Sequence, residues 1–169
     1  MAFVISRTAY LTMTFEELNS ELQKLVGESV SFVRVAANSI IIYFFGEPGD
    51  DSVVSVFIDP TWRFQRYGKV IVGSYDLQMD ESDFESEEKY QEEFQRMADL
   101  PSSLQGAVLE NIYIDFDSSD ISMTFSDGQI VRNFANSAFD DKDWTYRNAA
   151  QGIAACVSPL GIRLRTKKE

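Results

Sequence analysis

The chain of 169 residues contains no histidine and a single cysteine, Cys156. Without histidine, a Ser-His or Cys-His nucleophile pair and any His-ligated metal are excluded. A single cysteine excludes an internal disulfide and a Cys-rich zinc site, and Cys156 lies in an apolar run that predicts burial. The glycine-rich patterns GxxxxGK[ST], GxGxxG and GxSxG are also missing. We therefore expect a non-enzymatic protein with no cofactor, no catalytic residues and no metal. A hydrolase that uses a pair of carboxylates is the alternative, since acids are plentiful.

Long apolar segments are missing as well. The longest strongly apolar run covers residues 40–45, which is far too short to cross a bilayer. Residues 1–7 lack the basic start and sustained apolar stretch of a signal peptide. Together with the lone cysteine, these features favour a cytoplasmic protein with no membrane partner.

Positive charge is scarce: 15 basic residues stand against 27 acidic ones, a net charge of −12. Nucleic acids and anionic membranes need a positive footprint, so neither is an expected partner. A basic protein partner fits this charge, and so does solubility alone. The charge is also uneven, because residues 76–99 hold ten acids against Lys89 and Arg96.

Two capping boxes predict two helices. Residues 14–17 read Thr-Phe-Glu-Glu, apolar residues recur at helical spacing after them, and Gly27 follows as a stop, which predicts a helix over 15–26. Residues 82–85 repeat the box and predict a second helix through the acidic stretch, ending at Pro101.

The remaining apolar runs are typical of strands. Asp127-Gly128 between two alternating runs predicts a tight hairpin, whereas Pro60 predicts a turn over residues 59–62. The expected strands cover residues 30–35, 40–45, 53–58, 69–72, 112–116, 121–125, 144–147, 153–157 and 162–164. The fold class is therefore α+β, mostly antiparallel β-sheet, with two β-meander halves each preceded by a helix.

The two halves have similar patterns. Leu25-Val26-Gly27 and Leu104-Gln105-Gly106 precede their first strands at the same spacing, and a tryptophan, Trp62 or Trp144, follows each meander. We interpret this as an internal duplication, with one half over about residues 14–75 and the other over about 80–165. Each half by itself is too small to bury an adequate hydrophobic core, so residues 1–169 are expected to form one compact unit.

A resemblance rests on four segments of the second half: Leu104-Gln105-Gly106, the strand 121–125, Ser126-Asp127-Gly128 and residues 140–144. Together with residues 58–63 and 152–161, they resemble a family of small uncharacterised bacterial domains. The likeness covers most of residues 20–165, and the acidic insert 76–99 departs from it. It implies a β-rich fold of two related halves with no assigned catalytic residues. Some similar acidic proteins act as immunity proteins against bacterial toxins, which is the function that the resemblance implies here.

Three acidic groups are candidates for binding. Residues 115–120 (Asp-Phe-Asp-Ser-Ser-Asp) approach a calcium loop, but they lack its third acid, its glycine and its twelfth-position glutamate, so a polar turn is the alternative. Asp140, Asp141 and Asp143 could hold a hard cation or meet a partner's lysine or arginine, with Trp144 as apolar anchor. The alternative is a solvated loop with Trp144 in the core, and the same holds for Trp62.

The third group lies on the acidic helix. Its Tyr90, Phe94 and Met97 form an apolar stripe, which either packs on the sheet or is exposed for recognition. We predict that a basic protein partner, such as a toxin domain, is bound by eight residues: Glu85, Glu88, Glu92, Glu93, Asp140, Asp141, Asp143 and Trp144. The competing hypothesis is a small-ligand or cation-binding domain using the acidic loops around Asp115 and Asp140. A structural subunit of a homo-oligomer is a third, because the sequence leaves the oligomeric state open.

Overall fold

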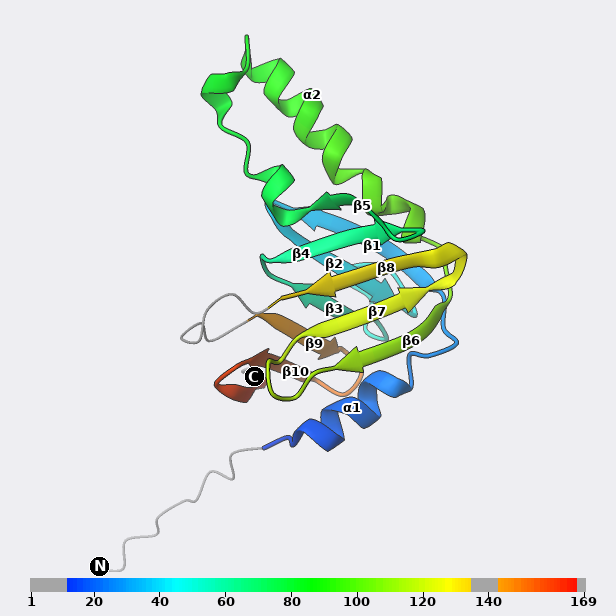
Figure 1. Cartoon of the computed structure of the whole chain (residues 1–169). Helices are drawn as coiled ribbons and strands as arrows, with labels where there is room; N and C mark the ends of the chain where they lie inside the picture. The colour runs from blue at the N-terminus through cyan, green and yellow to red at the C-terminus, as the bar shows by residue number, and fades with distance from the viewer. Residues whose placement is uncertain (1–11, 135–142, 167–169) are drawn as a thin grey trace, which may run out of the picture.

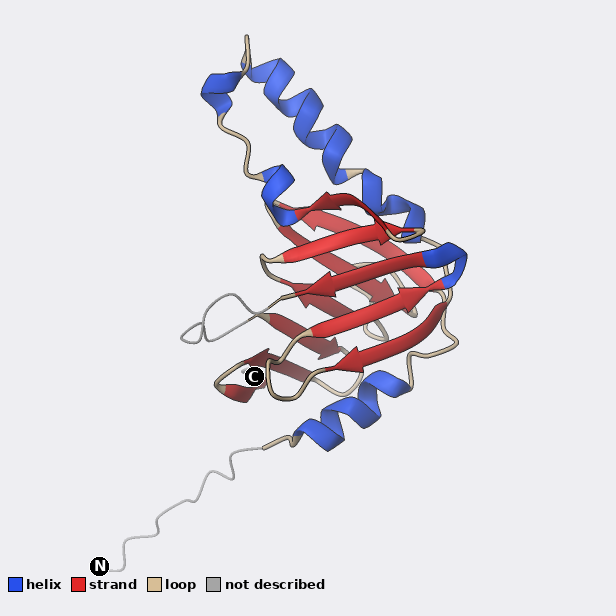
Figure 2. Ribbon diagram, in the orientation of Figure 1, coloured by secondary structure: helices blue, strands red, loops and turns tan. Residues whose placement is uncertain are grey.

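The chain folds as two antiparallel sheets that pack face to face, with one helix at each end of the sandwich (Figures 1 and 2). The structure, a computed structural model, describes residues 12–134 and 143–166. Helix α1 (Phe15–Gln23) lies beside β6, and helix α2 (Glu87–Ala98) runs away from the sandwich at the opposite end. This confirms the predicted α+β class dominated by antiparallel sheet. Within the described residues, no helix combines the length and apolar character needed to cross a membrane.

Each sheet is assembled from both halves of the chain. The six-stranded sheet has the order β1 (Val30–Ala36), β2 (Ser39–Phe44), β3 (Val54–Ile58), β9 (Trp144–Asn148), β10 (Ile153–Ser158), β11 (Gly161–Thr166). The five-stranded sheet has the order β5 (Lys69–Gly73), β4 (Trp62–Arg66), β8 (Gln129–Asn133), β7 (Ile121–Phe125), β6 (Leu109–Ile114). Four short 3₁₀ helices complete the described elements: η1 (Ser74–Leu77), η2 (Glu81–Asp83), η3 (Leu100–Leu104) and η4 (Ser126–Gly128).

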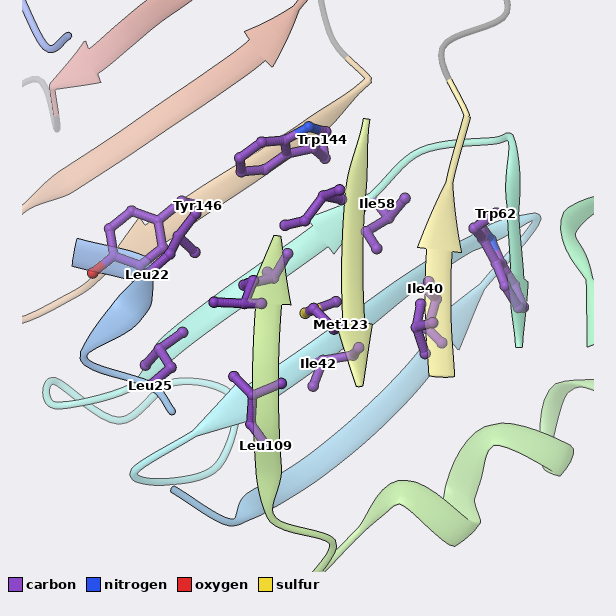
Figure 3. Close-up of a cluster of buried hydrophobic side chains, with 14 of the residues drawn as sticks. Leu22, Leu25, Ile40, Ile42, Ile58, Trp62, Leu109, Met123, Trp144 and Tyr146 are labelled. Carbon is purple, nitrogen blue, oxygen red and sulfur yellow. The ribbon is translucent and has the colours of Figure 1, made fainter. Parts of the chain in front are cut away.

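The hydrophobic core fills the space between the sheets, because alternate residues of each strand point inward. Figure 3 shows Ile40, Ile42 and Ile58 of one sheet with Leu109 and Met123 of the other. Helix α1 closes one end of the sandwich with Leu18 and Leu22, and both side chains are fully buried. The predicted capping box at Thr14 is present, with Glu17 N–H donating to Thr14 Oγ1 at 3.2 Å.

Two sequence-based expectations are wrong in detail. The second helix begins after Ser86 rather than at the box of residues 82–85. Asp80 Oδ1 accepts the backbone N–H and the hydroxyl of Ser82, which forms a short 3₁₀ turn there instead. Strand β4, which follows the turn around Pro60, was not expected. It forms because its alternation of Trp62 and Phe64 with polar residues is completed by pairing with β8.

The chain order shows a reciprocal exchange between the halves. The first half forms the meander β1–β2–β3 and then crosses to the other sheet, where β4 pairs with β8. The second half forms the meander β6–β7–β8 and crosses back, where β9 pairs with β3. Each third strand therefore pairs with the crossing strand of the other half. This correspondence is one of topology, and the duplication itself stays a prediction.

The two tryptophans occupy equivalent places in this exchange. Each is the first residue of a crossing strand, and each is buried, with 2% of Trp62 and 0% of Trp144 exposed. Trp62 Nε1–H donates to Asn38 O in the β1–β2 turn at 2.7 Å. Trp144 Nε1–H donates to Ser119 O in the β6–β7 turn, also at 2.7 Å. Both indoles therefore belong to the core and tie a crossing strand to the first turn of its own half.

The segments that enter the two meanders also pair with each other. Gly27 N–H donates to Leu109 O and Gly106 N–H donates to Val30 O, both at 2.8 Å. Both glycines have positive φ values, +93° and +84°, which a side chain rarely adopts. The matching motifs around Gly27 and Gly106 thus form one antiparallel bridge centred on Ser29 and Val108.

We expect Trp144→Phe to lower the free energy of unfolding by about 2 to 3 kcal/mol, measured by urea denaturation. Phenylalanine leaves Ser119 O without its indole donor and leaves a small void in the core. Trp62→Phe should give a similar loss, because its indole makes the equivalent bond. The control is Leu160→Ala at a side chain that is 65% exposed, which should change stability by less than about 0.5 kcal/mol. Equal stability of wild type and Trp144→Phe would contradict the role of the indole.

A second prediction concerns alkaline pH. Burial raises the pKa of Tyr146 above its ordinary value, and the Glu21 carboxylate 3.4 Å from its hydroxyl adds to the rise, whereas Asn148 Nδ2–H opposes it. The stability from the protonated phenol is complete below the unfolded pKa near 10 and is lost as pH rises through the higher folded pKa. Unfolding free energies between pH 9 and 11.5 should fall less steeply for Tyr146→Phe than for the exposed control Tyr113→Phe. Identical slopes would rule the proposed linkage out.

Candidate functional site

Residues 74–104 leave the sandwich between β5 and β6 and form what we call the acidic arm. It contains η1, η2, α2 and η3, and ten acids stand in it against two bases. None of the residues of α2 is fully buried. Only the base of the arm contacts the core: Leu77 and Leu104 are buried in it, and Phe94, Met97, Ala98 and Leu100 pack against it. The other end projects into solvent (Figure 1).

The projecting tip combines negative charge with aromatic rings. Residues 80–88 contain six acids and no base, and all six side chains are exposed. Among them, the Phe84 and Tyr90 rings meet edge to face with centroids 5.6 Å apart, and Tyr90 also lies 6.4 Å from the Phe94 ring. The predicted stripe therefore divides: Phe94 and Met97 pack on the core, whereas Tyr90 pairs within the arm.

The four predicted acids of the arm fall into two pairs. Glu92 is bound by Lys89 at 2.8 Å, and Glu93 is bound by Arg96 at 2.6 Å. The Arg96 hydrogen bonds lower the pKa of Glu93, and they do so against its slight desolvation. Glu85 and Glu88 are exposed and form no ion pair with a described residue. Of the four predicted acids of the arm, Glu85 and Glu88 are thus the two without an ion pair to a described residue.

Only two members of the second predicted group, Asp143 and Trp144, belong to the described residues. Asp140 and Asp141 lie outside the described residues. Asp143 and Trp144 begin β9 with 3% and 0% of their surface exposed, so both belong to the interior. Their burial follows from the crossing of the chain into the six-stranded sheet, where Trp144 pairs with Ile58. A partner on the protein surface therefore does not touch these two side chains.

Residues 115–120 form the turn between β6 and β7. Asp115 Oδ1 accepts the N–H groups of Asp117 and Ser118 at 3.0 and 3.3 Å, which is an Asx turn. Asp115 N–H in turn donates to Asp120 O at 2.9 Å. Within the described ranges, no group of three potential metal ligands comes together. This segment is the polar turn that was the alternative to a calcium loop.

A small pocket lies beside this turn, among residues of β6, β7 and β8. Its volume is about 260 Å³, and we call it the turn pocket. It is lined by Tyr113, Asp115, Asp120, Ile121, Ser122, Arg132, Asn133 and Phe134. Asn133 Oδ1 accepts the Ile121 N–H at 2.7 Å, but the buried Asn133 Nδ2 has no hydrogen-bond partner among the described residues.

Two arginines stand side by side next to the turn pocket. Arg63 of β4 and Arg132 of β8 are directly opposite each other in the sheet register. Arg132 Nε–H donates to Ser122 Oγ at 3.2 Å, and the Arg63 guanidinium carbon lies 4.4 Å from the centroid of the Phe134 ring. Neither arginine forms an ion pair with a described residue. Like charges at opposite positions destabilise a sheet, so this pair is an unusual feature.

Sequence reasoning missed these arginines. Arg63 and Arg132 are far apart in the chain, and they meet only because β4 crosses to pair with β8. The alternation of Trp62, Phe64 and their polar neighbours was a signal for β4, but nothing in the sequence indicated its register. Cys156, in contrast, is buried as expected, and the Thr145 hydroxyl lies 3.6 Å from its sulfur.

Comparison with known proteins found no matching family model, no matching curated protein and no matching solved structure.

The Asx turn at Asp115 gives a stability prediction. Asp115→Ala removes the acceptor for two backbone N–H groups and should lower the unfolding free energy by about 1 kcal/mol. Asp115→Asn keeps an oxygen at the same position and should be close to wild type. Urea denaturation of both variants measures the difference. An alanine variant as stable as the asparagine variant would show that the turn does not depend on this side chain.

Proposed function

We propose that this chain is a non-enzymatic protein-interaction module that binds a basic protein partner through its acidic arm. An immunity-like protein of bacterial type, which covers a basic toxin domain in the cytoplasm, is the specific form of this proposal. The observation that supports it is the projecting tip of the arm, where residues 80–88 carry six exposed acids and Phe84 pairs with the Tyr90 ring.

The core does not require the tip of the arm. A helix of 12 residues is marginal by itself in water, and α2 buries no residue completely. Only the base of the arm packs against the sandwich. Because exposed acids without nearby bases repel each other, the tip lowers rather than raises the stability of the isolated chain. A partner of opposite charge removes that repulsion.

Charge and aromatic rings would serve different parts of the interaction. The acids would steer a basic partner and set the rate and the salt dependence of association. Phe84 and Tyr90 would supply the apolar anchor, since desolvated aromatic side chains contribute most to the lifetime of protein complexes. Glu85 and Glu88 are the first expected contacts, because Glu92 and Glu93 already bind Lys89 and Arg96.

A charge reversal in the arm tests the proposal. A basic protein is first captured from native bacterial lysate at low salt, purified, and titrated by calorimetry. Glu85→Lys with Glu88→Lys should weaken its binding at least tenfold, because the partner then meets like charges. The matched control, Glu47→Lys with Asp51→Lys, changes the net charge equally in an exposed loop and should cost less than threefold.

Equal losses in both double variants would mean that net charge alone attracts the partner, and the proposal would fall. It would also fall if reversing Glu85 and Glu88 left binding unchanged. If no basic protein from the lysate stays bound at 300 mM salt, the net charge of −12 serves solubility rather than partner binding.

A further inference from the structure

The outer face of the six-stranded sheet, which points away from the core, carries arginines and no acidic side chain. Its strands β1, β2, β3, β9, β10 and β11 contain four arginines and no aspartate or glutamate, although the net charge of the chain is −12. The arginines alternate with residues that pack on the core, so all four lie on the outer face, and all four are exposed. They are Arg34, Arg147, Arg163 and Arg165. We call this surface the arginine face.

Aromatic side chains lie between two of these arginines. One row of the arginine face crosses β1, β2, β3 and β9 and consists of Phe32, Tyr43, Ser55 and Arg147. Arg34 stands two residues after Phe32, on the same face of β1. The Phe32 and Tyr43 ring centroids are 5.9 Å apart, and both side chains are partly exposed. Neither Arg34 nor Arg147 forms an ion pair with a described residue, so this region offers two cations beside a pair of rings.

The described helices leave the arginine face uncovered. Helix α1 lies beside β6 of the other sheet, and the base of α2 contacts β1 at the edge of the six-stranded sheet. The tip of the arm points away from the sandwich (Figure 1), so the arm does not lie over the face of its own molecule. Any arm that docks on this face must therefore come from another molecule.

We infer that the arginine face is the docking site for the acidic arm of a second copy of this chain. Residues 80–88 at the tip carry six exposed acids and no base, and Phe84 of the tip pairs with Tyr90. The acids would contact Arg34 and Arg147, and the ring pair of the arm would pack on the ring pair of the face. Opposite charges speed and orient association, and buried aromatic side chains prolong it, so the two surfaces complement each other in both respects.

The dimensions of the two surfaces agree. Helix α2 has 12 residues and is therefore about 18 Å long. Arg34 on β1 and Arg147 on β9 are three strand spacings apart, which is about 14 Å. One arm can thus reach both arginines at once. The contact joins two different surfaces, so a two-fold axis would produce it twice and close the dimer, with each arm on the face of the other copy.

A second copy fits this face better than a nucleic acid strand does. Glu47, Asp50 and Asp51 are exposed in the loop that joins β2 to β3, at one end of the face. They would repel a chain of phosphates that continued past the sheet, and a few arginines release few of its counterions. The arm is short, and docking would place cations among acids that otherwise repel each other.

The dimer would also regulate the arm, and this consequence rests on the proposed function. A basic partner and the arginine face need the same acids, above all Glu85 and Glu88, so the two complexes exclude each other. Each arm would stay covered in the dimer until a basic partner bound it more tightly than the second copy does.

Sedimentation of the full chain at low salt and at about 0.5 M salt tests the dimer. We expect a dimer at low salt and a dissociation constant at least tenfold higher at the higher salt. Arg34→Glu with Arg147→Glu should weaken the low-salt dimer at least tenfold, because the arm then meets like charges. The matched control, Arg66→Glu with Lys69→Glu, reverses two exposed cations of the other sheet and should change the dissociation constant less than threefold.

A mixture of two reversed variants provides a rescue. The face variant carries Arg34→Glu with Arg147→Glu, and the arm variant carries Glu85→Lys with Glu88→Lys. Each should stay monomeric by itself, since its arm and its face then have the same sign. The mixture should form a heterodimer with a dissociation constant within tenfold of wild type, because each arm meets a face of opposite sign. Only folded chains can do so, which separates a lost contact from lost folding.

The inference is overturned if the wild type is monomeric at low salt, if the control pair weakens the dimer as much as the face variant, or if the mixture stays monomeric. A monomeric wild type that binds a single-stranded oligonucleotide, and loses it in the face variant, would assign the face to nucleic acid instead.

The same variants separate this inference from the proposed function. The face variant keeps its arm, so it should bind the captured basic partner at least as tightly as the wild type does. A monomeric wild type whose partner binding still depends on Glu85 and Glu88 would refute the dimer and leave the proposed function standing. A dimer that behaves as described, in a chain for which no basic partner is found, would support the inference and refute the proposed function.

Discussion

The pairing of β3 with β9 and of β4 with β8 is the constraint on which the rest of the structure depends. Each pairing joins a strand of one half to a strand of the other, so neither half can complete a sheet by itself. The bridge between residues 27–30 and 106–109 joins the halves a third time, where both meanders begin. The buried indoles of Trp62 and Trp144 then hold each crossing strand to its own half. Folding of the two halves must therefore be mutual, since both contribute strands to both sheets.

This arrangement also separates the charges of the chain. In the described strands lie eight of the 15 basic residues and only one of the 27 acidic residues, Glu110. Lysine and arginine have long apolar stems that cover a sheet surface while their charged ends reach water, whereas short acidic side chains favour turns and helix starts. Although the net charge of the chain is −12, its described strands therefore carry more basic than acidic side chains. The expectation that neither nucleic acids nor anionic membranes are partners rests on net charge and stays a prediction, whereas local fields act within about a Debye length.

Local sequence signals predicted most of the fold. The capping box at Thr14, the Asp127-Gly128 hairpin and the alternating strands depend on neighbours within a few residues, and the structure contains all of them. Asp127 and Gly128 both have positive φ, as the tight turn requires. The predicted start of α2 was wrong because Asp80, rather than Ser82, caps the backbone there. Asp80 Oδ1 accepts the Ser82 N–H, and Glu81–Asp83 form a short 3₁₀ helix ahead of α2. Of the candidate site, the arm could be predicted from composition, but the turn pocket could not. Arg132 of the pocket meets Arg63 through a register that links distant residues, and no local pattern encodes that register.

The acidic arm and the surroundings of Asn133 are two places where the corresponding halves differ. The acidic arm is a long excursion before the second meander, whereas the first meander is preceded by the short helix α1. The turn pocket replaces Ile58, Phe57 and Ile41 of the first half with Asn133, Arg132 and Ser122. Polar groups at sites where the same framework accepts apolar ones reduce stability unless they are hydrogen-bonded. Asn133 Oδ1 and Ser122 Oγ meet this condition, because they accept hydrogen bonds from Ile121 N–H and Arg132 Nε–H, so the second half replaces apolar packing at these positions with a local hydrogen-bond network.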